Sequence, residues 1–118
     1  MKHSVLKYLE DVKLSIQDIE TYTANVFSVL EVQQNQLLFD ALCRRFAIIG
    51  EAIYQADKID SNLAITDKAK IKGLRHIIVH DYDTVRPPDI WRIISKNLPT
   101  FKTEVIDLIE TYNNNKIN

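Results

Sequence analysis

The sequence has 118 residues, of which 46% are hydrophobic and 26% are charged, and its formal net charge is -1 at pH 7. This size suits a single domain over residues 1–118, and the hydrophobic content excludes an intrinsically disordered chain. The net charge argues against a protein that coats nucleic acid with its whole surface, and two glycines and three prolines are too few for the turns of an all-β fold.

The first residues, Met1 to Ser4, are not followed by an apolar stretch of signal-peptide length, and no apolar run is long enough to span a membrane. Cys43 is the only cysteine, which excludes an internal disulfide and a multi-cysteine metal site. We therefore expect a cytoplasmic protein without a membrane partner. Cys43 itself is expected to be inert filler in a helix.

Hydrophobic periodicity predicts two helices in the first half of the chain. The first runs from about Ser4 to Tyr22, and the second covers about Asn35 to Gln55 after a break at residues 21–28. The expected buried stripes are Val5, Leu9, Val12, Ile16 and Ile19 in the first helix, and Leu38, Ala41, Leu42, Phe46, Ile49 and Ile53 in the second. Gly50 lies within the second helix, where glycine costs roughly 1 kcal/mol relative to alanine. We therefore expect another helix or a ligand to approach closely at Gly50.

A third helix is predicted after a polar linker over residues 57–65, with Thr66 as its N-cap. Its buried stripe is expected to consist of Ile71, Leu74 and Ile78. Residues 81–88 are predicted to form a loop, because Pro87 and Pro88 stop a continuing helix.

A fourth helix is predicted to begin near Pro88 or Asp89, and Trp91 is expected to lie in the core or in a dimer interface. Leu98 and Pro99 are expected to break or kink the chain before a last helix over residues 101–112, and the polar residues 113–118 are expected to fray. Because no segment shows sustained alternation with period 2, the prediction is an all-α, antiparallel bundle of four to five helices.

The third helix carries a cluster of polar residues toward its C-terminal end: Arg75, His76, His80, Asp81 and Tyr82. A helix packed only for stability has little use for this set, because buried polar groups need partners. At roughly 100° per residue, Arg75 and His80 lie about 140° apart around a straight helix, whereas His76 and His80 share a face. Arg75 and His80 can therefore form one site if the helix ends near His80, or if two copies of the helix face each other across a dimer.

The charge distribution points to the same region. Residues 65–96 contain seven basic and four acidic side chains, a local charge of +3 against -4 for the rest of the chain. A basic region on an acidic protein suits a local anionic ligand, although lysine-rich helix surfaces are common without one.

These residue types suit the cleavage of RNA, which carries its own nucleophile in the 2'-hydroxyl. The reaction needs a base, an acid and a cation for the charge that grows on phosphorus. Histidine can fill either proton role near neutral pH, and the planar fork of arginine matches phosphate oxygens. A metal held by His76 and His80 is the weaker interpretation, because zinc usually needs a third protein ligand and only Asp81 or Asp83 is near.

Three further residues have supporting roles in this hypothesis. His76 is either a second proton-transfer group or a residue that orients His80. Asp81 either orients His80 or is an ordinary turn residue after the helix. Glu51 is expected to be structural, or to pair with Arg44, Arg45 or Arg75, rather than to act as a general acid.

The pattern of Arg75, four residues, His80, one residue and Tyr82 resembles the motif of the HEPN-domain toxins called HepT. The segment from Tyr8 to Asp11 resembles the start of that family, and residues 40–52, which contain Ile-Gly-Glu-Ala at 49–52, resemble its second helix. Trp91 and the Leu-Pro pair at 98–99 suit its C-terminal part, so the resemblance covers nearly the whole chain. His76 stands where the family often has asparagine.

The resemblance implies a HEPN-like bundle that forms a homodimer with paired motifs in a cleft. It implies the toxin of a type VII toxin–antitoxin system, a metal-independent endoribonuclease that acts on tRNA or mRNA through Arg75 and His80. It also implies a partner, an MntA-like nucleotidyltransferase antitoxin that transfers AMP from ATP to Tyr82 and silences the toxin. ATP is then used by the partner, and this chain needs no cofactor of its own. The alternative is a non-enzymatic HEPN-type module that binds nucleotide or regulates a partner nucleotidyltransferase.

Overall fold

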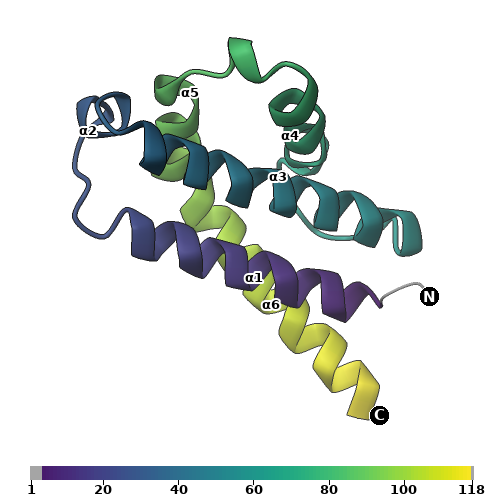
Figure 1. Ribbon diagram of the computed structural model, residues 1–118. Coiled ribbons are helices and arrows are strands. Elements are labelled where there is room, and N and C mark those ends of the chain that lie inside the picture. Colours follow the sequence, from purple (N-terminus) through teal and green to yellow (C-terminus); the bar gives the residue numbers. More distant parts are fainter. Residues whose placement is uncertain (1–3, 118) are drawn as a thin grey trace.

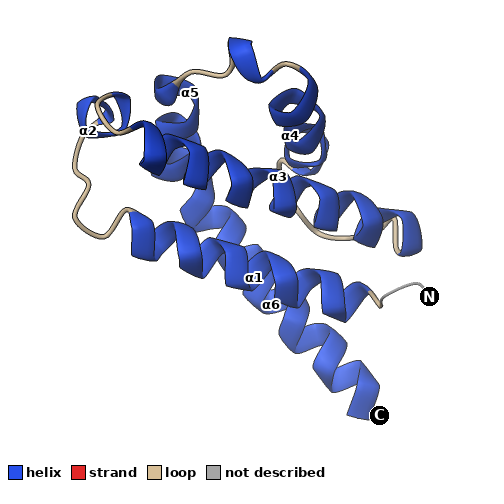
Figure 2. Ribbon diagram, viewed as in Figure 1, coloured by secondary structure: helices blue, strands red, loops and turns tan. Residues whose placement is uncertain are grey.

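A computed structural model describes residues 4–117, with side chains described as far as Asn114, and every regular element in this part is helical (Figure 2). The elements are α1 (Val5–Tyr22), α2 (Val29–Gln33), α3 (Gln36–Ile59), α4 (Lys68–His80), the 3-10 turn η1 (Tyr82–Thr84), α5 (Pro87–Arg92), the π-helical segment η2 (Ile93–Asn97) and α6 (Leu98–Ile117). The predicted all-α bundle is confirmed. None of these helices is long and apolar enough to cross a membrane.

The long helix α3 is the centre of the bundle (Figure 1). It runs antiparallel to α1 and contacts α4 on another side, while α6 crosses α1 behind them. The predicted stripe of α1 is fully confirmed, since all five of its residues are buried. In α3, Leu42, Phe46, Ile49 and Ile53 are buried as predicted, and Leu38 and Ala41 are partly buried.

Two helix starts differ from the sequence prediction. The short helix α2 was not predicted, although Ser28 and Glu31 form the capping box that marks a helix start. The N-cap of α4 is Asp67 rather than Thr66. Thr66 instead donates its amide and hydroxyl to the Glu104 carboxylate of α6, at 3.0 and 2.7 Å. A tertiary contact has therefore replaced the local cap.

A break at Leu98 and Pro99 is absent, whereas the alternative that was expected there, a kink, stays a prediction. The chain passes from α5 through η2 into α6 without a loop, and the amide of Leu98 bonds to the carbonyl of Ile93, five residues earlier. Pro99 then lies in the first turn of α6, where a missing amide is tolerated. The backbone of the polar segment expected to fray, 113–118, continues α6 to Ile117, and Asn118 lies outside the described residues.

Gly50 allows α3 and α4 to touch through their backbones. A Cβ atom at this position would lie 2.8 Å from the amide nitrogen of Arg75 and 2.9 Å from the carbonyl oxygen of Ile71. The close approach predicted from the sequence is thus confirmed, and it occurs at the first residue of the polar cluster. Any larger side chain at position 50 would push Arg75 away from α3.

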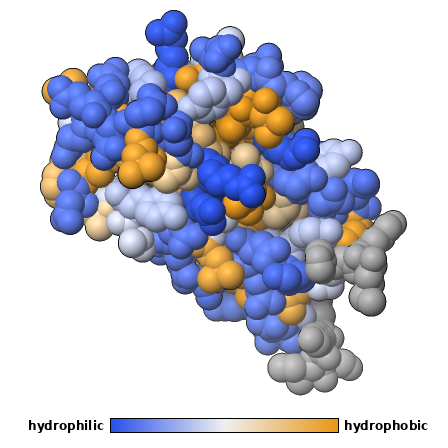
Figure 3. Space-filling model, viewed as in Figure 1, coloured by the Kyte–Doolittle hydropathy of each residue, from blue (hydrophilic) through white to orange (hydrophobic). Residues whose placement is uncertain are grey.

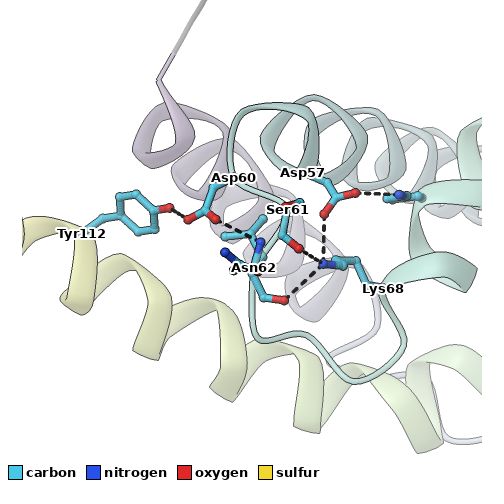
Figure 4. A network of polar contacts seen from close by, with 8 residues as sticks. Asp57, Asp60, Ser61, Asn62, Lys68 and Tyr112 are labelled. Carbon is cyan, nitrogen blue, oxygen red and sulfur yellow. Dashed lines mark hydrogen bonds and ion pairs between the residues drawn. The ribbon is translucent and has the colours of Figure 1, made fainter.

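A network of charged and polar side chains fixes the start of α4 (Figure 4). Asp57 of α3 lies 2.9 Å from the Lys68 ammonium and 2.6 Å from that of Lys72, and these cations hold the pKa of its carboxyl below the ordinary value. Nearby, the hydroxyl of Tyr112 in α6 donates to Asp60. Two cations of the basic segment therefore serve the fold and are not free for a ligand.

Candidate active site

Helix α4 ends at His80, one of the two arrangements that the helical angles allowed. The amide of Asp81 closes the last turn on the carbonyl of Ile77, at 2.8 Å, and the carbonyl of Asp81 accepts from the amide and hydroxyl of Thr84. Asp81 is thus the turn residue that stops α4. Within the described part of the chain its carboxylate makes no hydrogen bond to His80.

The two histidines lie side by side on the exposed surface of α4. The centroids of the His76 and His80 rings are 4.7 Å apart with their planes inclined by 47°, as their four-residue spacing predicts. Ile77 and Val79, two apolar side chains that are 44% and 53% exposed, lie next to them in the sequence. Figure 3 shows apolar patches of this kind between hydrophilic residues on the visible face.

Arg75 faces an open hollow of about 340 Å³ between α1, α3 and α4. Its Nε atom lies 3.3 Å from the Glu51 carboxylate, which confirms that Glu51 pairs with an arginine. Arg44, Tyr8 and Val79 also line the hollow, whereas His80 does not. Arg75 and His80 of one chain therefore open onto different parts of the surface, as the helical angles predicted.

Arg44 is a cation that the sequence analysis considered only as a possible partner of Glu51. It is exposed on α3, lines the same hollow as Arg75, and makes no ion pair within the described residues. Two carboxylates, Asp11 and Glu51, also line the hollow, and they pair with Lys7 and Arg75. Arg44 is therefore the guanidinium in this hollow that can bind phosphate oxygens without breaking an ion pair. The helical spacing of residues 44 and 51 on α3 was visible in the sequence, but the position of Arg75 opposite them was not.

Tyr82 lies in the turn after α4, and both its ring and its hydroxyl contact residues of α3. Its ring packs against Phe39, with centroids 6.0 Å apart, and its hydroxyl donates to the Asp40 carboxylate. The amide of Gln36 donates to the same hydroxyl at 3.3 Å. The hydrogen bond to Asp40 raises the pKa of Tyr82 to about 12, and it also lowers the pKa of Asp40. The side chain nevertheless remains 38% exposed.

Asp40 and Gln36 were not singled out from the sequence. They precede Tyr82 by 42 and 46 residues, so no local pattern links them to it.

The expectations for Cys43 and Trp91 hold. Cys43 is buried, and burial raises the pKa of its thiol to about 12, which makes it unreactive. Trp91 packs against the core.

No group of three or more histidine, cysteine, aspartate or glutamate side chains within the described residues is placed to hold a metal ion. His76 and His80 are neighbours, but the geometry gives them no third ligand from Asp81 or Asp83. The chemistry that the surface offers is therefore that of two imidazoles, two guanidinium groups and one anchored phenol.

Comparison with known proteins places the chain in a family. A family model described as ribonuclease HepT-like matches residues 12–108. A Methanocaldococcus jannaschii protein named as a gamma-glutamylcyclotransferase and candidate RNase is 29% identical, over all of this chain and 53% of its own length. This chain thus spans about half of that relative. A second protein of the same organism, named as a candidate RNase, is 28% identical over 88% of this chain and 95% of its own length. No solved structure matches the chain.

Proposed function

Because this chain belongs to the family of HepT-like ribonucleases, we propose that it is a metal-independent endoribonuclease and the toxin of a type VII toxin–antitoxin pair. The observation that carries the proposal is the position of Arg75, His80 and Tyr82 at the exposed C-terminal end of α4. All three side chains are exposed at this position, so an RNA ligand can reach them.

In the proposed reaction, the 2'-oxygen of the RNA forms a bond to the adjacent phosphorus while the bond from that phosphorus to the 5'-oxygen of the next nucleotide breaks. The products are a 2',3'-cyclic phosphate and a 5'-hydroxyl, which receives a proton as it leaves. His80 takes or supplies a proton, and Arg75 stabilises the charge that develops on the phosphate oxygens. The ion pair with Glu51 engages the Nε side of the Arg75 guanidinium. The other two nitrogens can then face a phosphate as a fork. His76 is a second candidate for proton transfer because its ring adjoins that of His80.

The working form in this proposal is a homodimer. One chain supplies a single His80, and Arg75 opens onto a different part of the surface. A second copy packed against the exposed Ile77 and Val79 would bring two Arg75–His80 sets to one cleft and remove apolar surface from water. The pair of sets would provide both an acid and a base without a metal ion.

The proposed regulation acts on Tyr82. A partner nucleotidyltransferase of the MntA type would transfer AMP from ATP to the hydroxyl of this residue, which is 38% exposed as a whole. Each AMP adds a negative phosphate and considerable bulk near the cations that would bind RNA, and so lowers the affinity of the site for RNA. Tyr82 is then a switch, not a catalyst.

The test of the nuclease is RNA cleavage by the purified protein, with and without EDTA. Arg75→Ala and His80→Ala are compared with Arg92→Ala, a control that removes an exposed cation from α5. Loss of an acid or base group costs about 10²–10⁴-fold in rate, so His80→Ala should be inactive within detection, and the control should cleave normally. Cleavage at the wild-type rate by both site variants would reject the assignment of these residues.

The same experiment separates the alternative function. If the wild-type protein leaves RNA intact in both buffers but binds ATP or a nucleotidyltransferase, the chain is a non-enzymatic HEPN-type module. The hollow beside Arg44 and Arg75 would then be the natural place for a nucleotide phosphate.

A further inference from the structure

The contact between Tyr82 and Asp40 has a chemical consequence beyond anchoring the turn. We propose that Asp40 is the catalytic base that takes the proton from the Tyr82 hydroxyl while AMP is transferred to it. This inference rests on the proposed regulation of Tyr82. It adds that the toxin chain itself supplies a catalytic residue for its own modification.

The geometry places the acceptor on the reacting atom before any partner binds. The hydroxyl of Tyr82 donates to Oδ1 of Asp40. The Nε2 atom of Gln36 lies 2.9 Å from the same carboxylate oxygen and 3.3 Å from the hydroxyl, so it braces both groups. The Phe39 ring supports the phenol from the protein side. The proton of the nucleophile is therefore already directed at a carboxylate.

The chemistry requires such an acceptor. With a pKa raised to about 12 by Asp40, the Tyr82 phenol is protonated at neutral pH and is a weak nucleophile. In the transfer, an electron pair of the phenolic oxygen forms a bond to the α-phosphorus of ATP, and the bond from that phosphorus to pyrophosphate breaks. The phenolic proton passes to Asp40 and then to water. Asp40 is ionised at neutral pH, since the ordinary pKa of aspartate is well below 7 and hydrogen bonds from Tyr82 and Gln36 lower it further. Aspartate has this role toward substrate hydroxyls in protein kinases.

Other titratable groups close to Tyr82 do not fill the role. Cys43 is buried with a pKa raised to about 12, so it holds its own proton. Asp81 and Asp83 flank Tyr82 in the sequence, but neither carboxylate makes a hydrogen bond to the hydroxyl within the described residues. Asp40 is thus the carboxylate in direct contact with the proton that must leave.

The experiment measures AMP transfer by intact mass, with the partner nucleotidyltransferase at saturating concentration, ATP and Mg²⁺. Asp40→Asn keeps the shape of the side chain and an acceptor oxygen but cannot take a proton. Asp83→Asn is the matched control, because it removes the same charge one residue from Tyr82 without touching the hydroxyl. We expect a rate about 100-fold lower for Asp40→Asn, within the range for a lost general base, and a rate close to wild type for the control.

Each outcome is decisive. AMP transfer to Asp40→Asn at the wild-type rate would overturn this inference and leave the proposed function intact. A wild-type chain that gains no AMP, or a Tyr82→Phe chain that gains as much as wild type, would overturn the proposed regulation as well. Thermal melting checks that Asp40→Asn is folded. Asp40→Glu, which retains a carboxylate, should be faster than Asp40→Asn, and equal rates for the two would also count against the base.

Discussion

The two ends of α4 place polar side chains in different surroundings. At the N-terminal end, Lys68 and Lys72 both pair with Asp57, whose side chain is 15% exposed, and the adjoining loop is fixed through the contact of Asp60 with Tyr112. At the C-terminal end, His76 and His80 are exposed, and the contact of Tyr82 with Asp40 lies at the surface.

The difference shows that residue type alone does not separate structure from function. Both ends contain a tyrosine that donates to an aspartate, and in both the pKa of the tyrosine rises to about 12, mainly through burial for Tyr112 and mainly through the hydrogen bond for Tyr82. One pair joins α6 to the loop before α4. The other holds the Tyr82 hydroxyl on α3 in a residue that is 38% exposed, and this is the hydroxyl that we propose is modified.

The position of the C-terminal end depends on Gly50, and the second glycine of the chain offers a matched comparison. Gly50→Ala should lower the free energy of unfolding by about 1–3 kcal/mol, because its methyl group would meet backbone atoms of Ile71 and Arg75 below 3.0 Å. Gly73→Ala meets nothing within 4 Å and should raise stability by about 0.5–1 kcal/mol through helix propensity. Urea unfolding of both variants measures the effect. Similar stabilities for the two variants would contradict the close approach of α3 and α4.

The N-terminal end should make folding sensitive to acid. The pKa of Asp57 is lowered in the folded state by Lys72 and Lys68, so its contribution to stability is complete above its unfolded pKa, near 4, and is lost as the pH falls through the lower folded value. The difference in unfolding free energy between wild type and Asp57→Asn should therefore shrink as the pH falls from 7 toward 3. Urea titrations at each pH measure it. A difference that stays constant with pH would show that Asp57 does not act through its charge.

Substitutions of the two tyrosines should have the smallest effects on stability. They should also separate the structural role of Tyr112 from the regulatory role proposed for Tyr82. Tyr112→Phe removes a hydrogen bond at a partly buried site and should cost about 0.5–1.5 kcal/mol in stability while RNA cleavage stays unchanged. Tyr82→Phe should cost less, because its hydroxyl is exposed, and should abolish AMP transfer. Thermal melting measures the loss of stability, and intact mass measures AMP transfer. A larger loss of stability for Tyr82→Phe than for Tyr112→Phe would reverse the roles assigned to the two ends.

Much of the fold was predictable because hydrophobic periodicity reports which face of a helix is buried. The stripes of α1 and α4 are buried as expected, and the end of α4 near His80 followed from the residues after it. The prediction failed in two places, once through a tertiary contact and once through local backbone geometry. Glu104 removed Thr66 from its capping role, and the π-helical turn carried the chain through Leu98 and Pro99.

By itself, the sequence determined the all-α class, the close helix approach at Gly50, and the grouping of Arg75, His80 and Tyr82 near the end of one helix. The helical class and the residue grouping depend on sequence patterns within about one or two helical turns. The close approach at Gly50 depends on the absence of a side chain there. Only the tertiary structure decided which polar side chains have a partner within the protein. Asp57 forms ion pairs with Lys68 and Lys72, and Glu51 forms one with Arg75. Asp40 accepts a hydrogen bond from the hydroxyl of Tyr82. Each of these partners lies on α3, and the packing of α4 against α3 brings them together across 11 to 42 residues of sequence.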